Sequence, residues 1–392
     1  MTTTLILGGG FGGLACARSL RARLPEAHRI VVVDRSPRFV VGATKTWIML
    51  DRMSEEEAGR PRGALLPERV ELVASEVLAI DPSRREVEIT SGTISADHLV
   101  LALGAELDMD AVPGLADTAM TFYTLSGAAR LREALARFRG GRLMLLIPRT
   151  PFQCPPAPYE ATLLLHAMLE DRGLRAATDL GVWTLELAPM QTAGPTMGKR
   201  VVDELRSRGI GFNPGKKTTS VDGARRTVRF EDGDEAPYDL LIAIPPHRAP
   251  RVLVAAGLAE TLGWVAVDPG TFEVRSAAAP RHVYAVGDAT SVPLPGRFDP
   301  AVPLALPKAG VFAAAAGEAV AGRIAAKVLG EGVASAFDGR GFCFIEVGGG
   351  RAMRADGAFF ETPSPVMTAQ PADEAQYRDK VAWISRWQAA IR

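Results

Sequence analysis

The chain has little of what marks several large classes of protein. Its 392 residues contain only three cysteines, with no CxxC pair and no Cys/His cluster at metal-ligand spacing. A disulfide framework and a structural metal site are therefore excluded. The 45 basic and 45 acidic side chains cancel, so no overall electric field would recruit nucleic acid or anionic lipid. We expect neither a bound metal nor a nucleic-acid partner.

Long hydrophobic runs are missing too. The most apolar stretch, 309–329, contains Glu318, Arg323 and Lys327, which is too much charge for a membrane-spanning helix. The chain opens with MTTTLILGGG, which predicts a strand and a glycine turn rather than a secretory signal. With 47% hydrophobic and 23% charged residues, the composition is that of a folded protein with a sizeable core. We expect a cytoplasmic protein of two or three domains.

Strand and helix patterns alternate along most of the chain, which predicts parallel sheets with helices on both faces. Residues 5–34 give a strand, a glycine turn, a helix and a second strand. A similar unit begins with the strand RLMLLI at 142, continues with a helix near 158–172 and reaches a strand at 184–187. The fold class is thus α/β with two Rossmann-like domains. The expected domains are a discontinuous first domain of 1–110 and 265–330, an inserted second domain of 111–264, and a C-terminal region of 331–392.

A glycine fingerprint lies at the start of the chain. Gly8, Gly10 and Gly13 fit the pattern GxGxxG between a strand and a helix, and Asp34 ends the next strand. The first glycine permits a tight turn, the second lets the backbone approach a pyrophosphate, and the third allows close strand–helix packing. The helix N-terminus offers free N–H groups to phosphates, and Asp34 would accept hydrogen bonds from a ribose. We predict a dinucleotide site rather than a plain glycine turn.

Two later segments indicate which dinucleotide binds. The stretch ADHLVLALGA at 96–105 runs a buried strand into Gly104. The stretch VYAVGDAT at 283–290 runs another into Gly287 and Asp288. They resemble the second and third signatures of flavoproteins of the pyridine nucleotide-disulfide oxidoreductase superfamily. The resemblance implies bound FAD, with Asp288 hydrogen-bonded to the ribityl chain. Taken alone, Asp288 also fits a helix N-cap after a strand.

The chain lacks glycine where nicotinamide-using members of this superfamily carry a second phosphate loop. Residues 142–172 contain none, and the turn after the strand reads IPRTPFQCPPAPYE. Proline has no N–H to offer a phosphate and cannot take the positive φ of a glycine turn. We therefore predict that NAD(P)H is not used. A cysteine, Cys154, occupies the vacated position.

Cys154 and Cys343 are the candidate reactive cysteines. Cys154 lies just before a helix expected to begin near Pro158, and a helix N-terminus favours the reactive thiolate. Glu160 is a candidate proton acceptor, although a first-turn glutamate also stabilises the helix dipole. An isolated cysteine is more often a small buried hydrophobe than a reagent, and Cys16 in the first helix is expected to be one. The residues alone leave both interpretations open for Cys154 and Cys343.

Together the motifs resemble those of the sulfide:quinone oxidoreductase and flavocytochrome c sulfide dehydrogenase family, over nearly the whole chain. The segments that carry the resemblance are GGGFGG (8–13), FQCPPAPYE (152–160), AVGDA (285–289), LPKAGVFA (306–313) and GFCFIEVGGG (341–350). The proline-rich CPPAPYE is the most specific of them. The resemblance implies that Cys154 and Cys343 face the flavin as a redox-active pair and that the C-terminal region caps the flavin.

The chemistry that this resemblance implies is FAD-dependent oxidation of sulfide or a related small sulfur compound. Hydrosulfide would attack a Cys154–Cys343 disulfide, leaving one sulfur as a persulfide and releasing the other as a thiolate, which passes two electrons to the flavin. Which cysteine carries the persulfide is left open. Reduced flavin gathers negative charge around N1 and O2, and Lys308 is expected to face it from the start of the helix near Ala309. A plain surface lysine is the alternative.

The chain also departs from the family pattern. No cysteine lies between 17 and 153. The third cysteine of many quinone-reducing members is therefore missing, as is the cysteine by which flavocytochrome members attach FAD. The corresponding segment is FVVGATKTW at 39–47. We expect non-covalent FAD and either a quinone or a cytochrome as the electron acceptor.

A C-terminal helix is expected at 374–391. Its apolar residues fall at helical spacing with Trp383 and Trp387 beside them, and cations such as Arg378 and Lys380 supply charge. Such a helix can lie in a membrane interface, where a quinone is found. It can also dock on the protein itself or on a partner protein. The expected location is therefore cytoplasmic, with peripheral contact on the inner face of the membrane as one placement of this helix.

Two other functions compete with sulfide oxidation. An NADH:acceptor flavin oxidoreductase would share the fold and the FAD signatures, and the glycine-free turn argues against it. A non-catalytic flavin-binding partner subunit would tolerate the loss of both cysteines, and the retained pair argues against it.

Overall fold

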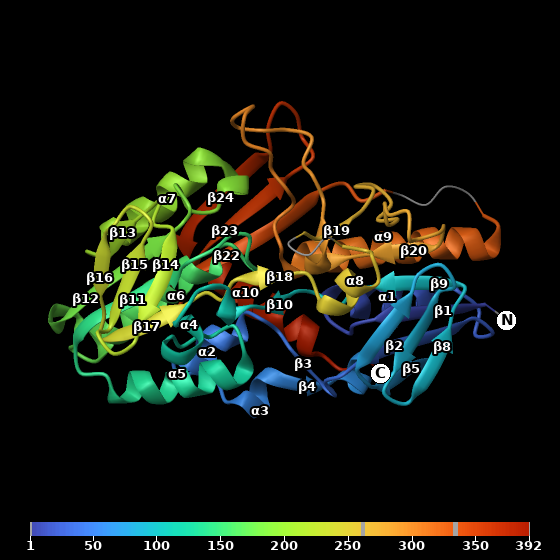
Figure 1. Cartoon of the computed structure of the whole chain (residues 1–392), viewed down its shortest axis with the longest axis horizontal. Coiled ribbons are helices and arrows are strands. Elements are labelled where there is room, and N and C mark those ends of the chain that lie inside the picture. The colour runs from blue at the N-terminus through green and yellow to red at the C-terminus, as the bar shows by residue number, and fades with distance from the viewer. Residues whose placement is uncertain (1, 260–262, 332–335, 392) are drawn as a thin grey trace.

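The computed structural model describes residues 2–259, 263–331 and 336–391. It is an α/β protein with two parallel sheets, one at the right of Figure 1 (blue) and one at the left (green and yellow). The C-terminal strands, in red, run near the centre of that view.

The first sheet is built from short, almost wholly apolar strands. Their order is β20-β9-β1-β2-β5, and every pair is parallel. The bounds are β1 Thr3–Leu7, β2 Arg29–Asp34, β5 Val70–Ala74, β9 His98–Leu101 and β20 Val283–Ala285. Residues 283–285 thus join a sheet whose other strands all lie within residues 3–101. Strands of this composition need helices on both faces of the sheet.

Helices α1 (Phe11–Arg23) and α9 (Gly310–Leu329) pack against each other beside this sheet. Glycine allows their close approach, because a Cβ on Gly317 would lie 2.2 Å from the carbonyl oxygen of Gly12. Val320 and Ile324 of α9 are fully buried in the same core. The packing brings the first turns of both helices to the carboxyl ends of the strands.

Smaller elements complete this part of the chain. Two antiparallel ladders join β3 (Arg38–Val40) to β4 (Gly59–Pro61), and β6 (Val77–Asp81), β7 (Glu86–Ile89) and β8 (Gly92–Ser95) to one another. Two short helices, α2 (Thr44–Met49) and α3 (Glu55–Ala58), lie between β3 and β4 in the sequence.

The second sheet is also parallel, in the order β13-β12-β11-β17. Its strands are β11 Gly141–Ile147, β12 Thr178–Thr184, β13 Gly211–Asn213 and β17 Leu240–Ala243. Helix α8 (Arg251–Ala255) follows β17 in the sequence but packs against β6 of the first part. The helices of the second part are α4 Leu115–Thr118, α5 Leu125–Arg137, α6 Ala157–Asp171 and α7 Gly194–Arg206. A three-stranded antiparallel sheet adjoins them, formed by β14 Thr218–Asp222, β15 Thr227–Phe230 and β16 Glu235–Pro237.

The strand expected at 184–187 is wrong in its position. Strand β12 pairs with β11 from Thr178 to Thr184, and Leu187 beyond it is 77% exposed. The reason is that β11 ends at Ile147, and Pro148 after it has no N–H to extend the ladder. Glu186, expected inside a strand, therefore lies in the loop that follows β12.

Two further ladders are only two residues long. Strand β10 (Glu106–Leu107) pairs with β18 (His247–Arg248), and β19 (Val265–Ala266) pairs with β21 (Thr290–Ser291). We propose that the chain passes between its two Rossmann-like units at the β10–β18 ladder, which lies near the boundary drawn from the sequence at 110 and before the one drawn at 264.

The C-terminal region is an antiparallel sheet followed by a helix. Its strands are β22 Arg340–Gly348, β23 Arg351–Ala358 and β24 Val366–Asp373, in that order. Helix α6 packs against β22, and helix α10 (Glu374–Gln388) packs mainly against β23.

Of the three placements considered for the C-terminal helix, the structure shows docking on the protein itself. Trp383 stacks on Phe11 with ring centres 5.6 Å apart, and Trp387 meets the same ring edge-on at 4.7 Å. Lys380, expected as an exposed cation, is only 2% exposed. The tryptophan-bearing face is therefore packed against the protein, with both tryptophan side chains half-buried. No helix among the described residues combines the length and the apolar character that crossing a bilayer requires.

Candidate functional site

A cavity of about 770 Å³ opens at the carboxyl ends of the first sheet. In an α/β sheet this edge is where ligands bind. Six residues singled out in the sequence line it: Gly8, Gly10, Asp34, Gly104, Gly287 and Asp288. Gly13 and Lys308, also singled out, are not among its lining residues.

The glycines of the fingerprint have separate tasks. Gly8 has a φ of +100°, and a Cβ there would lie 2.3 Å from the carbonyl oxygen of Ala102. A Cβ on Gly13 would lie 1.9 Å from the carbonyl oxygen of Gly8. Gly10 has no atom within 4 Å of its Cβ position and faces the cavity. Gly8 and Gly13 therefore shape the turn, and Gly10 leaves room for a ligand.

Asp34 is held at the rim of the cavity by the backbone and by a buried arginine. Its Oδ2 accepts the N–H of Gly9 and its Oδ1 the N–H of Ser36, both at 2.8 Å. Arg62 Nη2 lies 3.2 Å from Oδ1, and Arg62 is buried and lines the same cavity. Sequence reasoning missed Arg62, because a lone arginine in a short turn carries no pattern that signals burial.

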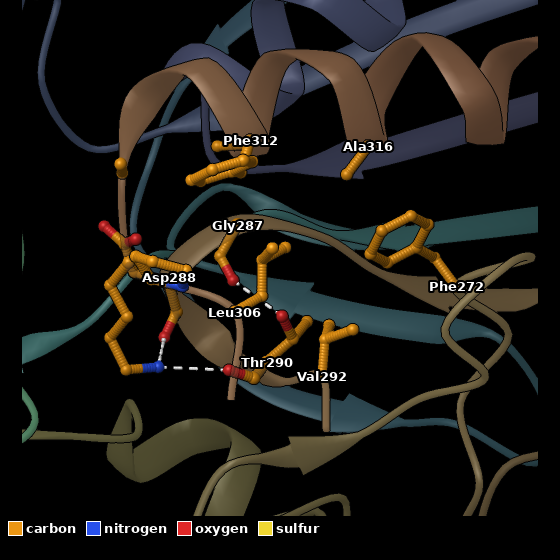
Figure 2. Close-up of a pocket in the computed structure, with 12 residues that line it drawn as sticks. Phe272, Gly287, Asp288, Thr290, Val292, Leu306, Phe312 and Ala316 are labelled. Carbon is orange, nitrogen blue, oxygen red and sulfur yellow. Dashed lines mark hydrogen bonds between the residues drawn. The ribbon is translucent and has the colours of Figure 1, made fainter. Parts of the chain in front are cut away.

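Asp288 presents an unused oxygen to the cavity. Its Oδ2 accepts the side-chain N–H of Gln153 at 2.5 Å, whereas Oδ1 is buried without a hydrogen-bond partner. Burial raises the pKa of this carboxyl group. Figure 2 shows Gly287 and Asp288 beneath the first turns of α9, whose Phe312 and Ala316 face them. A buried acceptor beside a cavity requires a donor, such as a hydroxyl group of a ligand.

Lys308 directly precedes α9 and binds the turn that carries Asp288. Its ammonium donates to the carbonyl oxygens of Asp288 (2.7 Å) and Thr290 (3.0 Å) and lies 3.3 Å from the ring centre of Trp264. Burial lowers the pKa of Lys308 to about 8. The side chain is thus buried and bound to the turn that carries Asp288, so Lys308 is not the surface lysine that was the alternative. Its backbone also contributes, because the carbonyl oxygen of Lys308 accepts the N–H of Cys154 at 2.7 Å.

The loop from 148 to 156 carries Cys154 toward the large cavity. Gln153 binds Asp288, Cys154 binds the backbone of Lys308, and the carbonyl oxygen of Cys154 accepts the N–H of Ala157 at the start of α6. Cys154 has a φ of +54°, a left-handed conformation that is rare outside glycine. Backbone strain of this kind concentrates at functional sites.

Cys343 lies on β22 of the C-terminal sheet. It lines a small apolar cavity of about 30 Å³ together with Pro155 and with the rings of Phe342 and Phe359. A negative charge on Cys154 raises the pKa of Cys343, so the two thiols lie within electrostatic reach of each other. Both are free thiols in this structure.

The expectation of a stabilised Cys154 thiolate is wrong for the free thiols. Surrounding protein raises the pKa of Cys154 to about 12, the charge of Glu160 adds to the rise, and Lys380 opposes it. Burial raises the pKa of Cys343 to about 12 as well. Cys154 is accessible to solvent. A residue in a hollow can be reached by water and still be enclosed by protein on most sides. Here the desolvation that raises the thiol pKa outweighs the lowering expected from the helix N-terminus.

Glu160 is committed to partners other than a thiol. Its Oε1 lies 2.8 Å from Lys380 Nζ, and its Oε2 accepts the backbone N–H of Glu346 at 2.8 Å. The residue is buried, and burial raises the pKa of its carboxyl group although Lys380 opposes the rise. This arrangement does not leave Glu160 poised as the proton acceptor that its spacing suggested.

Lys45 is a second residue that the sequence did not single out for the site. It lies in α2, lines the large cavity and donates to the carbonyl oxygen of Tyr123 at 2.5 Å. Burial lowers the pKa of Lys45 to about 8, and a negative charge on Cys154 would raise it. A cation thus stands within electrostatic reach of Cys154. Its segment, 39–47, had been noted only because a cysteine is missing from it.

Comparison with known proteins matches these features over most of the chain. Residues 2–145 match the family described as pyridine nucleotide-disulphide oxidoreductase, and residues 128–245 match the central part of the sulfide dehydrogenase [flavocytochrome c] flavoprotein chain. The solved structure of the sulfide:quinone oxidoreductase of Aquifex aeolicus superposes with a TM-score of 0.85 and 21% identity, covering 98% of this chain and 90% of that one. The two family models together span residues 2–245, and the fold of the described residues is that of the Aquifex aeolicus enzyme. The chain is thus similar to oxidoreductases of these two families.

Two relatives illustrate the range of this family and its neighbours. The mitochondrial sulfide:quinone oxidoreductase of Mus musculus is 27% identical over 308 residues, which cover 74% of this chain and 66% of the relative. An alternative NAD(P)H-ubiquinone oxidoreductase C1 of Arabidopsis thaliana is 32% identical over 209 residues, which cover 47% of this chain and 39% of the relative. The chain thus spans about two thirds of the first relative and less of the second.

The residues around the large cavity fit a flavin cofactor. The glycine turn leaves space at Gly10, Asp34 lies at the strand end next to it, and Asp288 offers a buried acceptor without a partner. These are the groups that would meet a pyrophosphate, a ribose and a polyhydroxy chain, respectively.

A second cavity, of about 340 Å³, lies beside the carboxyl end of the second sheet. Glu186, Trp264 and Lys308 line it. Glu186 is buried and accepts the hydroxyl of Tyr159. Burial raises the pKa of Glu186 from 4.5 to about 7, although the hydrogen bond from Tyr159 opposes the rise.

This raised pKa predicts a pH-dependent contribution to stability. A carboxyl group that holds its proton more tightly when folded stabilises the protein fully below pH 4.5 and loses that effect as pH rises through 7. Between pH 5 and pH 8 the free energy of unfolding of the wild-type chain should fall by on the order of 2 to 3 kcal/mol relative to that of Glu186→Gln. Urea unfolding at the two pH values measures this difference. Glu133→Gln, at an exposed helix position, is the control. A difference between wild type and Glu186→Gln that stays constant with pH would contradict the assignment.

Proposed function

We propose that this chain oxidises sulfide, or a related small sulfur compound, with Cys154 and Cys343 and delivers the electrons through FAD to a quinone. A cytochrome is the second acceptor considered. One observation supports this most strongly: the loop that carries Cys154 is hydrogen-bonded to Asp288 of the flavin cavity through the neighbouring Gln153. A thiol in that place stands beside the cofactor rather than in a distant core.

The reaction begins with the two cysteines joined as a disulfide. Hydrosulfide attacks one sulfur, a new S–S bond forms between substrate and that cysteine, and the Cys154–Cys343 bond breaks. The bond electrons leave with the other cysteine as a thiolate, so the substrate sulfur is oxidised at the expense of the disulfide. A second hydrosulfide takes the outer sulfur of the persulfide away as a hydrodisulfide anion, which leaves both cysteines as thiols. FAD, when bound, would supply the two-electron acceptor that oxidises these thiols back to the disulfide.

The surroundings of the thiols suit this chemistry. Once formed, a thiolate at a site that raises the thiol pKa to about 12 is a strong nucleophile, because thiolate nucleophilicity increases with pKa. The same high pKa slows its release from the disulfide. The nearby ammonium of Lys45 favours the approach of an anion such as hydrosulfide. In this proposal Cys154 and Cys343 react and Lys45 assists by its charge. Glu160 stabilises the arrangement and does not take the proton.

The same loop argues against a nicotinamide cofactor. A phosphate loop needs free N–H groups, and here the N–H of Cys154 is bound to Lys308 while prolines 148, 151, 155 and 156 have none. The similarity to the Arabidopsis NAD(P)H oxidoreductase extends over less than half of this chain. FAD is proposed to be held without a covalent bond, since no cysteine lies between 17 and 153.

Steady-state turnover with paired acceptors tests the proposal. The purified holoprotein is mixed with sulfide and either a short-chain ubiquinone or cytochrome c, and reduction of each is followed by its absorbance. We expect sulfide-dependent quinone reduction that requires the protein. Reduction of cytochrome c alone would indicate that a cytochrome, the second candidate, is the electron acceptor. Reduction of neither, with an intact flavin spectrum, would contradict the proposed function.

A further inference from the structure

Two carboxylates and one ammonium meet in the interior beside the cysteine segments. Lys380 Nζ lies 2.8 Å from Glu160 Oε1 and 2.9 Å from Glu346 Oε2. All three side chains are buried, with exposed fractions of 2% for Lys380, 6% for Glu160 and 0% for Glu346. A buried charge group of this kind is stable only when its partners are complete.

The group joins three elements that are far apart in the sequence. Glu160 lies in α6, six residues after Cys154, and Glu346 lies in β22, three residues after Cys343. The backbone N–H of Glu346 also donates to Glu160. Lys380 reaches both carboxylates from α10. One C-terminal side chain therefore ties together the two segments that bear the cysteines.

The charges of the group balance once Arg52 is included. Glu346 also accepts the indole N–H of Trp47 at 2.8 Å and lies 3.0 Å from Arg52 Nη1. Two carboxylates thus face two cations. Removing Lys380 alone would leave two carboxylates to one cation, and they would then repel each other across the α6–β22 contact.

The same helix also contacts the wall of the large cavity. Phe11, which lines that cavity, stacks on Trp383 of α10. Helix α10 therefore contacts the flavin side and the cysteine side of the site at once. This agrees with docking on the protein itself, one of the three placements that the sequence left open.

We propose that Lys380 is a positioning residue of the cysteine pair: through Glu160 and Glu346 it fixes the distance between α6 and β22, and so the distance at which Cys154 and Cys343 meet. The proposal rests on the proposed function in that it takes these cysteines as the reactive pair. Its expected effect is on how readily the two sulfurs form a disulfide.

The test is the equilibrium between the Cys154–Cys343 dithiol and its disulfide in glutathione redox buffers, read by mass spectrometry on the full-length holoprotein. In Lys380→Met the constant for disulfide formation should fall at least tenfold, equivalent to about 30 mV. Lys380→Arg keeps the charge and should restore most of the loss. Arg378→Met, which removes an exposed cation from the same helix, should leave the constant unchanged.

A charge-neutral variant keeps the proposal testable where Lys380→Met does not fold. Lys380→Met combined with Glu160→Gln removes one cation and one carboxylate together, and it should show the same tenfold loss in a folded protein. If the wild type forms the disulfide and every Lys380 variant forms it equally well, the positioning role is overturned and the proposed function stands. If the wild type forms no such disulfide, both fail.

Discussion

Replacing Cys154 by serine should abolish reduction of the flavin by sulfide, with a loss of at least about 1,000-fold in the single-turnover rate. Serine keeps the size of the side chain and its place beside Asp288, but it cannot form the S–S bond on which the proposed transfer depends. Cys343→Ser should cause the same loss, because both sulfurs of the disulfide are required. Anaerobic mixing of each oxidised variant with sulfide, followed by flavin absorbance, measures the rate.

The third cysteine provides the matched control. Cys16 is fully buried in α1, where burial raises the pKa of its thiol, and its backbone N lies close to Gly317 of α9. Cys16→Ala is expected to lower stability slightly and to leave the sulfide rate within a factor of two or so of wild type. A Cys154→Ser variant that still bleaches at the wild-type rate would remove the cysteines from the mechanism and favour the non-catalytic flavin-binding subunit.

Two alanine substitutions in the glycine fingerprint should have different effects, one on stability and one on flavin affinity. A Cβ on Gly13 meets the backbone oxygen of Gly8 at 1.9 Å, and neither atom can move without opening the turn. Gly13→Ala should therefore destabilise even the apoprotein by about 3 kcal/mol or more. A Cβ on Gly10 meets no protein atom within 4 Å. Gly10→Ala should fold normally and lose flavin affinity at least about tenfold, because the methyl group occupies space that the pyrophosphate needs.

The measurements are the free energy of unfolding of the apoprotein and the dissociation constant for FAD. Gly211→Ala is the control, because its Cβ would make only ordinary contacts, the nearest at 3.6 Å, and lies in the second sheet. The division of tasks between the glycines is contradicted if Gly10→Ala destabilises the apoprotein as much as Gly13→Ala, or if it binds FAD as tightly as wild type.

Local signals in the sequence were enough for the framework of the site. The turn from Gly8 to Gly13 is dictated by neighbours a few residues away, and the helices at Ala157 and Gly310 begin close to where the sequence predicted them. Asp34 and Asp288 could be found because each ends a strand of a parallel sheet, and such ends meet at one edge.

What the sequence did not reveal depends on contacts between distant segments. Lys380 looked like a surface cation because helical spacing does not show which face another element covers, and its partners are 34 and 220 positions away. The same kind of packing buries Arg62 and half-buries Lys45. Lys308 directly precedes α9, as predicted. The two backbone carbonyl oxygens to which its side chain donates come from a turn about 20 residues earlier, and the sequence did not show that contact. The raised pKa of Cys154 likewise comes from surrounding protein rather than from its own helix.

Anaerobic stopped-flow mixing of the purified, oxidised holoprotein with sulfide, and separately with NADH, tests the central claim most directly. Our account predicts that sulfide bleaches the flavin with a transient long-wavelength absorption band, that Cys154→Ser abolishes this, and that NADH has no effect. Bleaching by NADH and not by sulfide would contradict the account, because it would mean that the proline-rich loop around Cys154 admits a nicotinamide cofactor after all.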